Sequence, residues 1–274
     1  MLKKVLLSFL FLFLLSPYAL GYEDIIDIKV NGEYINTQTS TFIEDGVTLA
    51  PVRFVAEALG AKGIYWDKDS YTAGIDMGND YILIDIKNNS IYFNSKLYEK
   101  NSKAKIVNDR TYVPVRLISE LLGADVSWNS YYKNVEITMP NHQVPKSSVS
   151  SLYGEDDLLW LGRIIHAESQ GEPMSGKIAV GNVILNRVNS KQFPNTIYDV
   201  IFDTFPSVQF QPTANGAIYN NPSQDSVKAA KHALSGTNLV GESLFFFNPK
   251  IATSFWIEQN RPYYTTIANH DFYL

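Results

Sequence analysis

The sequence predicts an α+β fold built from two units. Three observations predict it: a duplicated pattern of strands and a short helix in the first half, two long helical stripes in the second half, and strand-like runs after them. A chain of 274 residues is long enough for two domains, and 45% apolar against 19% charged residues is typical of globular proteins. The chain has no cysteine, which excludes disulfides, thiol nucleophiles and cysteine-ligated metal sites.

The formal net charge is mildly acidic, at −5. An acidic chain has no global electrostatic attraction to the phosphates of nucleic acid or to an anionic membrane surface. We therefore expect no nucleic-acid partner and no polybasic membrane binding.

Residues 1–21 are interpreted as an export signal. Two lysines precede an apolar run from residue 5 to residue 15, and the small residues Ala19 and Gly21 then form an Ala-x-Gly cleavage site. A membrane span needs about 20 apolar residues, whereas this run breaks at Pro17, so an uncleaved anchor is the less favoured alternative. Cleavage after Gly21 would leave a secreted protein without a stable membrane span.

The next part of the chain, residues 22–140, contains an internal duplication. Residues 47–61 read VTLAPVRFVAEALGA and residues 110–124 read RTYVPVRLISELLGA, at a constant offset of 63. Agreement of this density indicates a true repeat, with copies at about residues 25–78 and 88–139. We call residues 22–140 the repeat module and expect each copy to fold as strand, strand, short helix, strand, strand.

Local signals support each of these elements. Pro51 and Pro114 fit the first turn of the two short helices, where a missing N–H costs nothing. Gly60 is suited to cap the first helix at its C-terminal end. The strands that follow the helices are expected at Gly63–Trp66, Ala73–Asp76, Asp125–Trp128 and Val135–Thr138.

The duplicated pattern PVR-(F/L)-(V/I)-x-E-x-L-GA, followed by Trp, resembles the module called copper amine oxidase N-terminal-like, over about residues 25–139. A copper amine oxidase site needs three histidines and a modified tyrosine, and none of the chain's four histidines lies in this region. The resemblance therefore implies a non-catalytic exported module for wall attachment or positioning, with a cell-wall component or an accessory protein as its partner. Residues 141–153 are polar and contain proline and a serine cluster, which is typical of a short linker.

A helical stripe over residues 156–168 ends in a carboxyl group. Glu168 lies three residues after Ile165 and extends the apolar face of the helix instead of the solvated one. A carboxyl group at the end of a buried stripe is partly desolvated, which raises its pKa and suits it to general-acid catalysis. The structural alternative is that Glu168 caps backbone amides or pairs with Arg163 or Arg187.

The remaining elements of the second half follow the same signals. A second helix is expected at about Ser175–Asn189, a third at Ser223–Ser235 with Gly236 as its cap, and strands at Leu244–Phe247 and Tyr263–Ile267. Asn182 and Asn186 are four residues apart, and we expect both to face the first helix, either as a satisfied buried amide pair or as sugar contacts.

A set of ordered motifs resembles the cell wall hydrolase family that includes the spore-cortex-lytic enzymes SleB and CwlJ. The motifs are an AE-x-x-GEP turn, a G-x-x-AV-x-x-V-x-LNRV helix, FP, QF, NP and a terminal NHDFY. The resemblance implies that residues 154–274 form a compact α+β domain similar to lysozymes and lytic transglycosylases, with peptidoglycan glycan strands as substrate and Glu168 as the catalytic acid. Ala268 departs from the pattern, because the family usually has glycine there, and this puts the local turn in doubt.

A glycan cleft needs flat aromatic faces for sugar rings and amides or hydroxyls for their substituents. The residues predicted to bind substrate are Glu172, Asn186, Gln209, Phe210, Asn248, Tyr263 and His270. Glu172 lies past the first helix, on the turn, and is expected to have a structural or substrate-positioning role. No metal motif is present, so we expect neither a metal site nor a cofactor.

Two mechanisms can cleave the β-1,4 bond between N-acetylmuramic acid and N-acetylglucosamine. A hydrolase adds a second carboxylate about 5–5.5 Å or about 6.5–9.5 Å from the acid. A lytic transglycosylase reuses one glutamate and lets the muramoyl C6 hydroxyl attack C1. Asp199, Asp203, Glu242 and Asp271 are the candidate second acids, but none lies in a compelling motif.

We therefore favour the lytic transglycosylase, acting in spore cortex lysis during germination or in wall turnover. The expected location is secreted, at the cell wall or associated with the spore. The alternatives are a hydrolytic muramidase or glucosaminidase, and a non-catalytic protein that binds cell-wall glycan.

Overall fold

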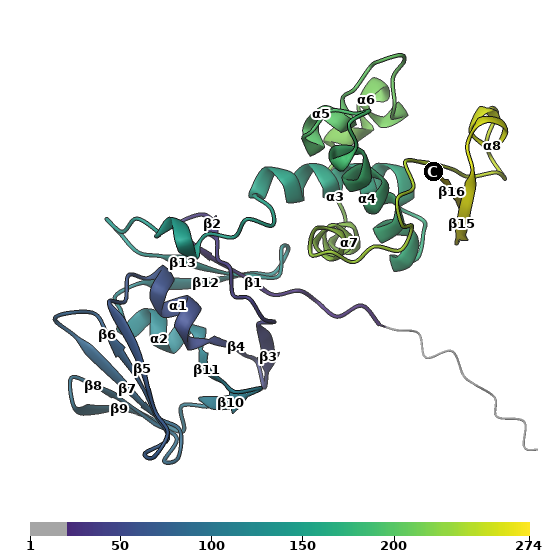
Figure 1. Ribbon diagram of the computed structural model, residues 1–274. Coiled ribbons are helices and arrows are strands. Elements are labelled where there is room, and N and C mark those ends of the chain that lie inside the picture. The colour runs from purple at the N-terminus through teal and green to yellow at the C-terminus, as the bar shows by residue number, and fades with distance from the viewer. Residues whose placement is uncertain (1–20) are drawn as a thin grey trace, which may run out of the picture.

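The computed structural model describes residues 21–274 and confirms the α+β class (Figure 1). Apart from Gly21, the predicted export signal falls outside the described residues. Within those residues, no helix combines the length and the apolar character that crossing a membrane requires.

The repeat module consists of strands around two short helices. Its elements are β1 (Asp27–Val30), β2 (Glu33–Tyr34), β3 (Phe42–Glu44), β4 (Val47–Pro51), α1 (Val52–Ala58), β5 (Gly63–Asp67), β6 (Thr72–Asp76), β7 (Tyr81–Asp85), β8 (Ser90–Phe93), β9 (Lys96–Lys100), β10 (Lys105–Val107), β11 (Arg110–Pro114), α2 (Val115–Leu121), β12 (Asp125–Asn129) and β13 (Asn134–Thr138). They form three sheets, in the orders β12-β13-β1-β2, β10-β11-β4-β3 and β5-β6-β7-β8-β9. The helices α1 and α2 contribute Val55 and Ile118 to one core shared by all three sheets.

The two copies of the repeat interlock through their strands. Strand β1 of the first copy pairs in parallel with β13 of the second, and β4 pairs antiparallel with β11. Gly60 caps α1 with a φ of 90°, as expected. Pro51 and Pro114 are the last residues of β4 and β11 and are the N-caps of the helices, so each helix begins one residue later than predicted.

Residues 141–153 connect the two units along the surface of the repeat module. They contain the 3-10 helix η1 (Lys146–Ser148), and Val149 forms a bridge with Ile35. The side chain of Asn31 donates to the carbonyls of Met139 and His142, at 2.9 and 2.8 Å. These contacts hold the connecting segment on the module.

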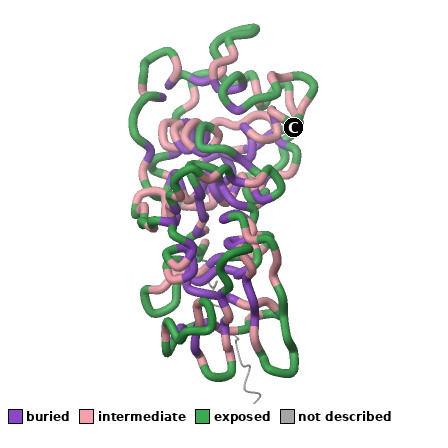
Figure 2. Tube along the Cα trace, turned by 90° about the vertical axis from the view of Figure 1, so that its left-hand side faces the viewer, coloured by how far each residue is buried: buried purple, intermediate pink, exposed green. Residues whose placement is uncertain are grey.

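The C-terminal unit, residues 154–274, packs three long helices against a small sheet. Its elements are α3 (Glu155–Ser169), α4 (Met174–Asn189), α5 (Ile197–Ile201), α6 (Gln211–Asn215), η2 (Ala217–Tyr219), α7 (Gln224–Leu234), β14 (Phe245–Phe247), α8 (Trp256–Asn260), β15 (Tyr263–Ile267) and β16 (His270–Tyr273). Helices α3, α4 and α7 contact one another, and the sheet has the order β14-β16-β15. Figure 2 shows buried segments inside both units and exposed loops around them.

Buried charged and aromatic contacts join the two units where β1 and the β12–β13 turn meet α7. Lys231 on α7 is 2% exposed, and its ammonium lies 2.5 Å from the Asp27 carboxylate and 3.0 Å from the carbonyl oxygen of Ile25. Asp27 also accepts a hydrogen bond of 2.9 Å from the Tyr153 hydroxyl. The hydroxyl of Tyr131, in the β12–β13 turn, donates to the carbonyl of Pro222. We call this set of contacts the joint.

The turn between β15 and β16 has a backbone that favours glycine. Ala268 lies in this turn with a φ of 55°, in the left-handed region. This conformation costs a residue with a Cβ about 1–2 kcal/mol. The departure from the family pattern at Ala268 therefore places one strained residue in this turn.

Replacing Asp27 with Ala should lower the free energy of unfolding by about 3 kcal/mol, because it leaves the Lys231 ammonium buried without its counter-charge. The second substitution Lys231→Met should recover most of that loss. Urea denaturation measures both effects. Asp24→Ala, which breaks the more exposed pair with Lys228, is the matched control and should cost less than about 1 kcal/mol. Equal losses for Asp24→Ala and Asp27→Ala would contradict the role given to the joint.

Replacing Ala268 with Gly should raise the free energy of unfolding by about 1 kcal/mol, because glycine adopts a positive φ without strain. Thermal and urea denaturation measure the change. The control Ala214→Gly, on the exposed surface of α6, should lower stability by about 0.5–1 kcal/mol. Destabilisation by Ala268→Gly would show that the turn is not strained.

Candidate active site

The C-terminal end of α3 is fixed by hydrogen bonds. The hydroxyl of Ser169 donates to the carbonyl of Ile165 at 2.6 Å. The ammonium of Lys177, on α4 and 5% exposed, donates to the carbonyl of Gln170 at 3.0 Å and to that of Glu172. A cation at this position satisfies carbonyls that a helix end leaves without a partner. The last turn of α3, which carries Glu168, is therefore rigid.

Glu168 is half-buried on this turn, as its spacing in the sequence predicts. Burial raises the pKa of its carboxyl group from 4.5 to about 7, and the nearby charge of Arg187 opposes this increase. Among the described residues, Arg187 is the one charged group that shifts this pKa. A carboxyl group with a pKa near neutral is protonated often enough to give up a proton and ionised often enough to take one back.

Arg187, on α4, is the buried cation beside Glu168. Its Nε donates to the carbonyl of Leu244 at 2.8 Å, and its Nη1 lies 3.4 Å from Oε1 of Gln209. Burial lowers the pKa of this guanidinium to about 10, while the charges of Asp203 and Glu168 act in the opposite direction. The rings that surround the guanidinium are Phe193, Phe210 and Phe245, with centroids at 4.8, 5.1 and 5.5 Å. From the sequence alone, Arg187 was only an alternative partner for Glu168.

The candidate second acids contribute nothing to the pKa of Glu168. The carboxylates of Asp199 and Asp203 bind loop groups, with the former accepting from Thr196 and the latter from the backbone N–H of Phe205. The carboxylate of Asp271 accepts from the Thr266 hydroxyl at 2.5 Å. Glu242, the fourth candidate, is exposed.

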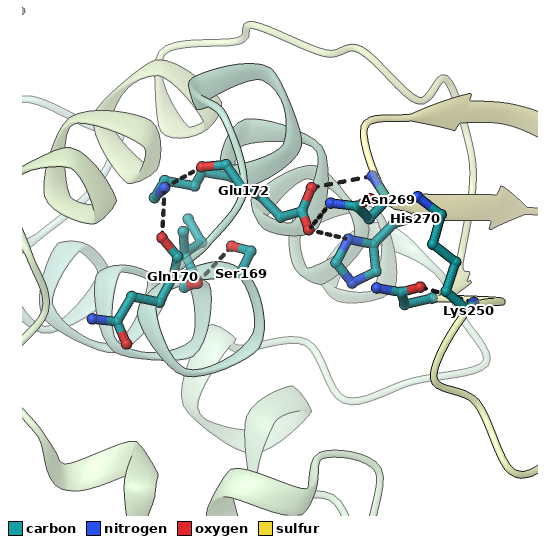
Figure 3. A network of polar contacts seen from close by, with 9 residues as sticks. Ser169, Gln170, Glu172, Lys250, Asn269 and His270 are labelled. Carbon is teal, nitrogen blue, oxygen red and sulfur yellow. Dashed lines mark hydrogen bonds and ion pairs between the residues drawn. The ribbon is translucent and has the colours of Figure 1, made fainter.

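Glu172 connects the turn after α3 to the β15–β16 hairpin (Figure 3). Its carboxylate accepts hydrogen bonds from the backbone and side-chain N–H groups of Asn269, at 3.2 and 3.0 Å, and lies 3.7 Å from Nδ1 of His270. A Cβ on Gly176 would lie 2.9 Å from the Cβ of Glu172, so glycine is needed for this close approach. The geometry supports a structural role for Glu172.

His270 is buried beside Glu172 and is 7% exposed. Burial lowers the pKa of its imidazole, and the charges of Glu172 and Asp271 oppose this decrease. The ring lies edge-on to Phe246 at 5.4 Å. His270 therefore supports the hairpin from inside. The structure indicates this supporting role instead of the predicted substrate contact.

Two other residues predicted to bind substrate have internal roles. Phe210 is 3% exposed and lies against Arg187, so its ring has no free face for a sugar. Its role is to support the guanidinium, instead of the predicted contact with substrate. Asn186 donates to the carbonyls of Gly241 and Ser243, at 2.8 and 2.9 Å. Asn182 donates to the carbonyl of Thr237, so both amides are satisfied inside the protein, as in the first of the two alternatives, and their partners lie in the loop after α7 instead of on α3. They hold the loop after α7.

The remaining predicted residues lie nearer the surface. Gln209 connects Arg187 to the carbonyl of Ser207, to which its Nε2 donates at 2.9 Å. Asn248 is half-buried and accepts from the backbone N–H of Lys250, and Tyr263 is 57% exposed on β15. Of the predicted set, the structure joins Gln209 and Phe210 to Glu168 through Arg187, and Glu172 to His270 in a separate cluster.

Comparison with known proteins gives two family matches. Residues 171–273 match the cell wall hydrolase family, and residues 29–137 match the copper amine oxidase N-terminal domain. The C-terminal unit belongs to the cell wall hydrolase family. Glu168 lies three residues before the matched range of this cell wall hydrolase domain.

Individual relatives are similar over a comparable length. The chain is 40% identical over 126 residues to a spore cortex-lytic enzyme of Bacillus cereus, covering 46% of this chain and 47% of that protein. It is 38% identical over 120 residues to the spore cortex-lytic enzyme of Bacillus subtilis, covering 44% and 38%. The chain thus spans about half the length, or less, of these curated relatives.

A solved structure is also similar in sequence. It is the catalytic domain of the germination-specific lytic transglycosylase SleB from Bacillus anthracis, with 40% identity, covering 46% of this chain and 100% of that one, and a TM-score of 0.42.

Replacing Glu168 with Gln should stabilise the fold at pH 8 but not at pH 4. Because the pKa is about 7 in the folded chain and 4.5 ordinarily, the carboxyl group is protonated in both states at low pH. Ionisation of Glu168 lowers the stability of the folded state increasingly between these two pH values, and by about 3 kcal/mol above them. Urea denaturation at the two pH values measures this. The control Glu242→Gln, at an exposed site, should change stability by less than about 0.5 kcal/mol at both. A gain independent of pH would contradict the buried position of Glu168.

Proposed function

We propose that this chain cleaves peptidoglycan between N-acetylmuramic acid and N-acetylglucosamine as a lytic transglycosylase, with Glu168 as the general acid and base. The observation that carries the proposal is a half-buried glutamate with a pKa of about 7 at the rigid end of α3. The family match and the names of the similar proteins support peptidoglycan as the substrate.

The proposed reaction needs one carboxyl group. Protonated Glu168 donates its proton to the glycosidic oxygen, and the bond from that oxygen to C1 of the muramoyl sugar breaks. The resulting carboxylate then accepts the proton of the C6 hydroxyl as O6 attacks C1, which forms a 1,6-anhydro sugar and returns Glu168 to its starting state. In the hydrolytic alternative, water takes the place of the C6 hydroxyl.

Arg187 has a supporting role in this scheme. Its charge favours the carboxylate that appears when Glu168 gives up the proton, while burial favours the protonated form. The balance of these two effects keeps the pKa near 7. The carboxylates of Asp199, Asp203 and Asp271 are bound to groups of their own loops or hairpin, which supports the single-glutamate route over the two-carboxylate one.

The biological setting is part of the proposal. The similar proteins named spore cortex-lytic enzymes favour cortex peptidoglycan during germination and an extracellular or spore-associated location. We assign catalysis to residues 154–274 and a non-catalytic role to the repeat module, with residues 141–153 between them and the export signal before them.

Glu168→Gln should lower the rate of release of soluble fragments from purified sacculi at least about 100-fold, because the amide cannot donate the required proton. The wild-type rate should fall above about pH 7 as Glu168 loses its proton. The control Glu242→Gln should keep the wild-type rate. Full activity of Glu168→Gln would refute the assignment.

Mass spectrometry of the released fragments separates the two mechanisms. We expect 1,6-anhydromuramic acid ends from the wild-type enzyme. Fragments with reducing ends alone would establish a hydrolase instead, and binding to sacculi without any release would establish a wall-binding protein.

A further inference from the structure

The repeat module has a cleft of about 730 Å³. Helix α1, the edge strand β5 with the turn after it, and the β10–β11 hairpin line this cleft. Its walls are aromatic and cationic, and they include Arg53, Trp66, Lys68, Tyr71 and Arg110. Nothing in the proposed reaction uses these side chains.

Two exposed aromatic rings form one side of the cleft. Trp66 is 45% exposed and Tyr71 is 49% exposed, and their rings meet edge to face with centroids 6.0 Å apart. An indole held in place by a second ring offers a flat apolar face at little cost in side-chain entropy. Such a face suits the CH groups on one side of a sugar ring.

The cleft is positively charged within an acidic module. Three basic residues and one acid, Asp109, line it, whereas residues 22–140 carry 17 acids and 12 bases. Arg53 is paired with Glu57 at 3.6 Å, so Lys68 and Arg110 supply the positive charge of the cleft. The guanidinium of Arg110 makes no hydrogen bond or ion pair with a described residue, and its Nη1 is buried without a partner. The carboxylate of Asp67 is directed into the β5–β6 turn, where it accepts from the N–H groups of Asp69 and Ser70. A ligand with a carboxylate would complement this charge.

The duplication offers an internal comparison. Trp66 and Trp128 have the same place in the hairpins β5–β6 and β12–β13, and Tyr71 and Lys133 both have a positive φ in the following turns. The turn that contains Lys133 docks on the C-terminal unit through the joint. The matching turn in the first copy forms no hydrogen bond or ion pair with the C-terminal unit among the described residues, and its Tyr71 ring packs against Trp66.

We propose that this cleft binds peptidoglycan, with a sugar ring stacked on Trp66 and a carboxylate of the stem peptide on Arg110. The proposal rests on the proposed function, since the catalytic site acts on the same polymer. A volume of about 730 Å³ lies within the range of about 300–1,000 Å³ that is typical of ligand pockets, and it suits a disaccharide with its peptide. Binding at two sites on one polymer raises the effective concentration of glycan at Glu168.

Co-sedimentation with insoluble sacculi tests the proposal, using the full mature chain with Glu168→Gln so that the sacculi stay intact. The sacculi are stripped of phosphate-containing polymers beforehand. Trp66→Ala should raise the apparent Kd about tenfold. The matched control Trp128→Ala, which removes the equivalent ring outside the cleft, should change it less than twofold. Arg110→Gln should weaken binding and make it less sensitive to salt.

Thermal denaturation checks that Trp66→Ala and Tyr71→Ala are folded. Wild-type affinity of both folded variants for the sacculi would overturn the proposal. So would an equal loss for Trp128→Ala, or binding that disappears when the phosphate polymers are removed. Cleavage of short soluble glycan fragments, measured with Glu168 intact, reports on the proposed function separately. Trp66→Ala should leave that cleavage unchanged, so a failed cleft and a failed catalytic assignment give different results.

Discussion

The candidate active site depends on the burial of one guanidinium. A buried cation is costly unless its charge is compensated and its N–H groups are bonded. Arg187 meets these requirements with a carbonyl, an amide, three aromatic rings and the charges of Asp203 and Glu168. In doing so it connects α4, the loop before α6 and β14 around the end of α3. Because those groups also compensate the cation, about half of the Glu168 carboxyl groups can remain protonated near pH 7 instead of being held as carboxylates.

The second polar cluster, formed by Glu172, Asn269 and His270, has a structural role, whereas Glu168 is the proposed catalytic acid. Glu172 is only four residues from Glu168, yet its carboxylate is occupied by Asn269 and faces His270. One glutamate of the AE-x-x-GEP motif therefore holds the terminal hairpin in place, and the other, Glu168, has no such partner among the described residues. Phe210, Asn186 and His270 also have supporting roles inside the protein, because their side chains are buried or bound to backbone groups.

Periodic features could be predicted from the sequence, and long-range ones could not. The helices α3, α4 and α7 begin and end within about two residues of their expected bounds, and the position of Glu168 on the buried face follows from its spacing to Ile165. The five-residue helices α5, α6 and α8 are too short to show a period. The direction in which Asn182 and Asn186 point depends on the loop after α7, and the role of Arg187 depends on three phenylalanines far apart in the chain. No local pattern contains such information.

The joint also bears on how chains of this kind recombine. The ammonium of Lys231 finds its carboxylate and carbonyl partners on the segment that leads into β1, on β1 itself and on the β12–β13 turn. A C-terminal unit transplanted behind an unrelated module would keep Lys231 and lose these partners. Shuffling, natural or engineered, therefore has to carry Asp27 and the β12–β13 turn along with α7. The part of the chain that has to be transferred as one piece is therefore larger than the hydrolase domain that sequence similarity outlines.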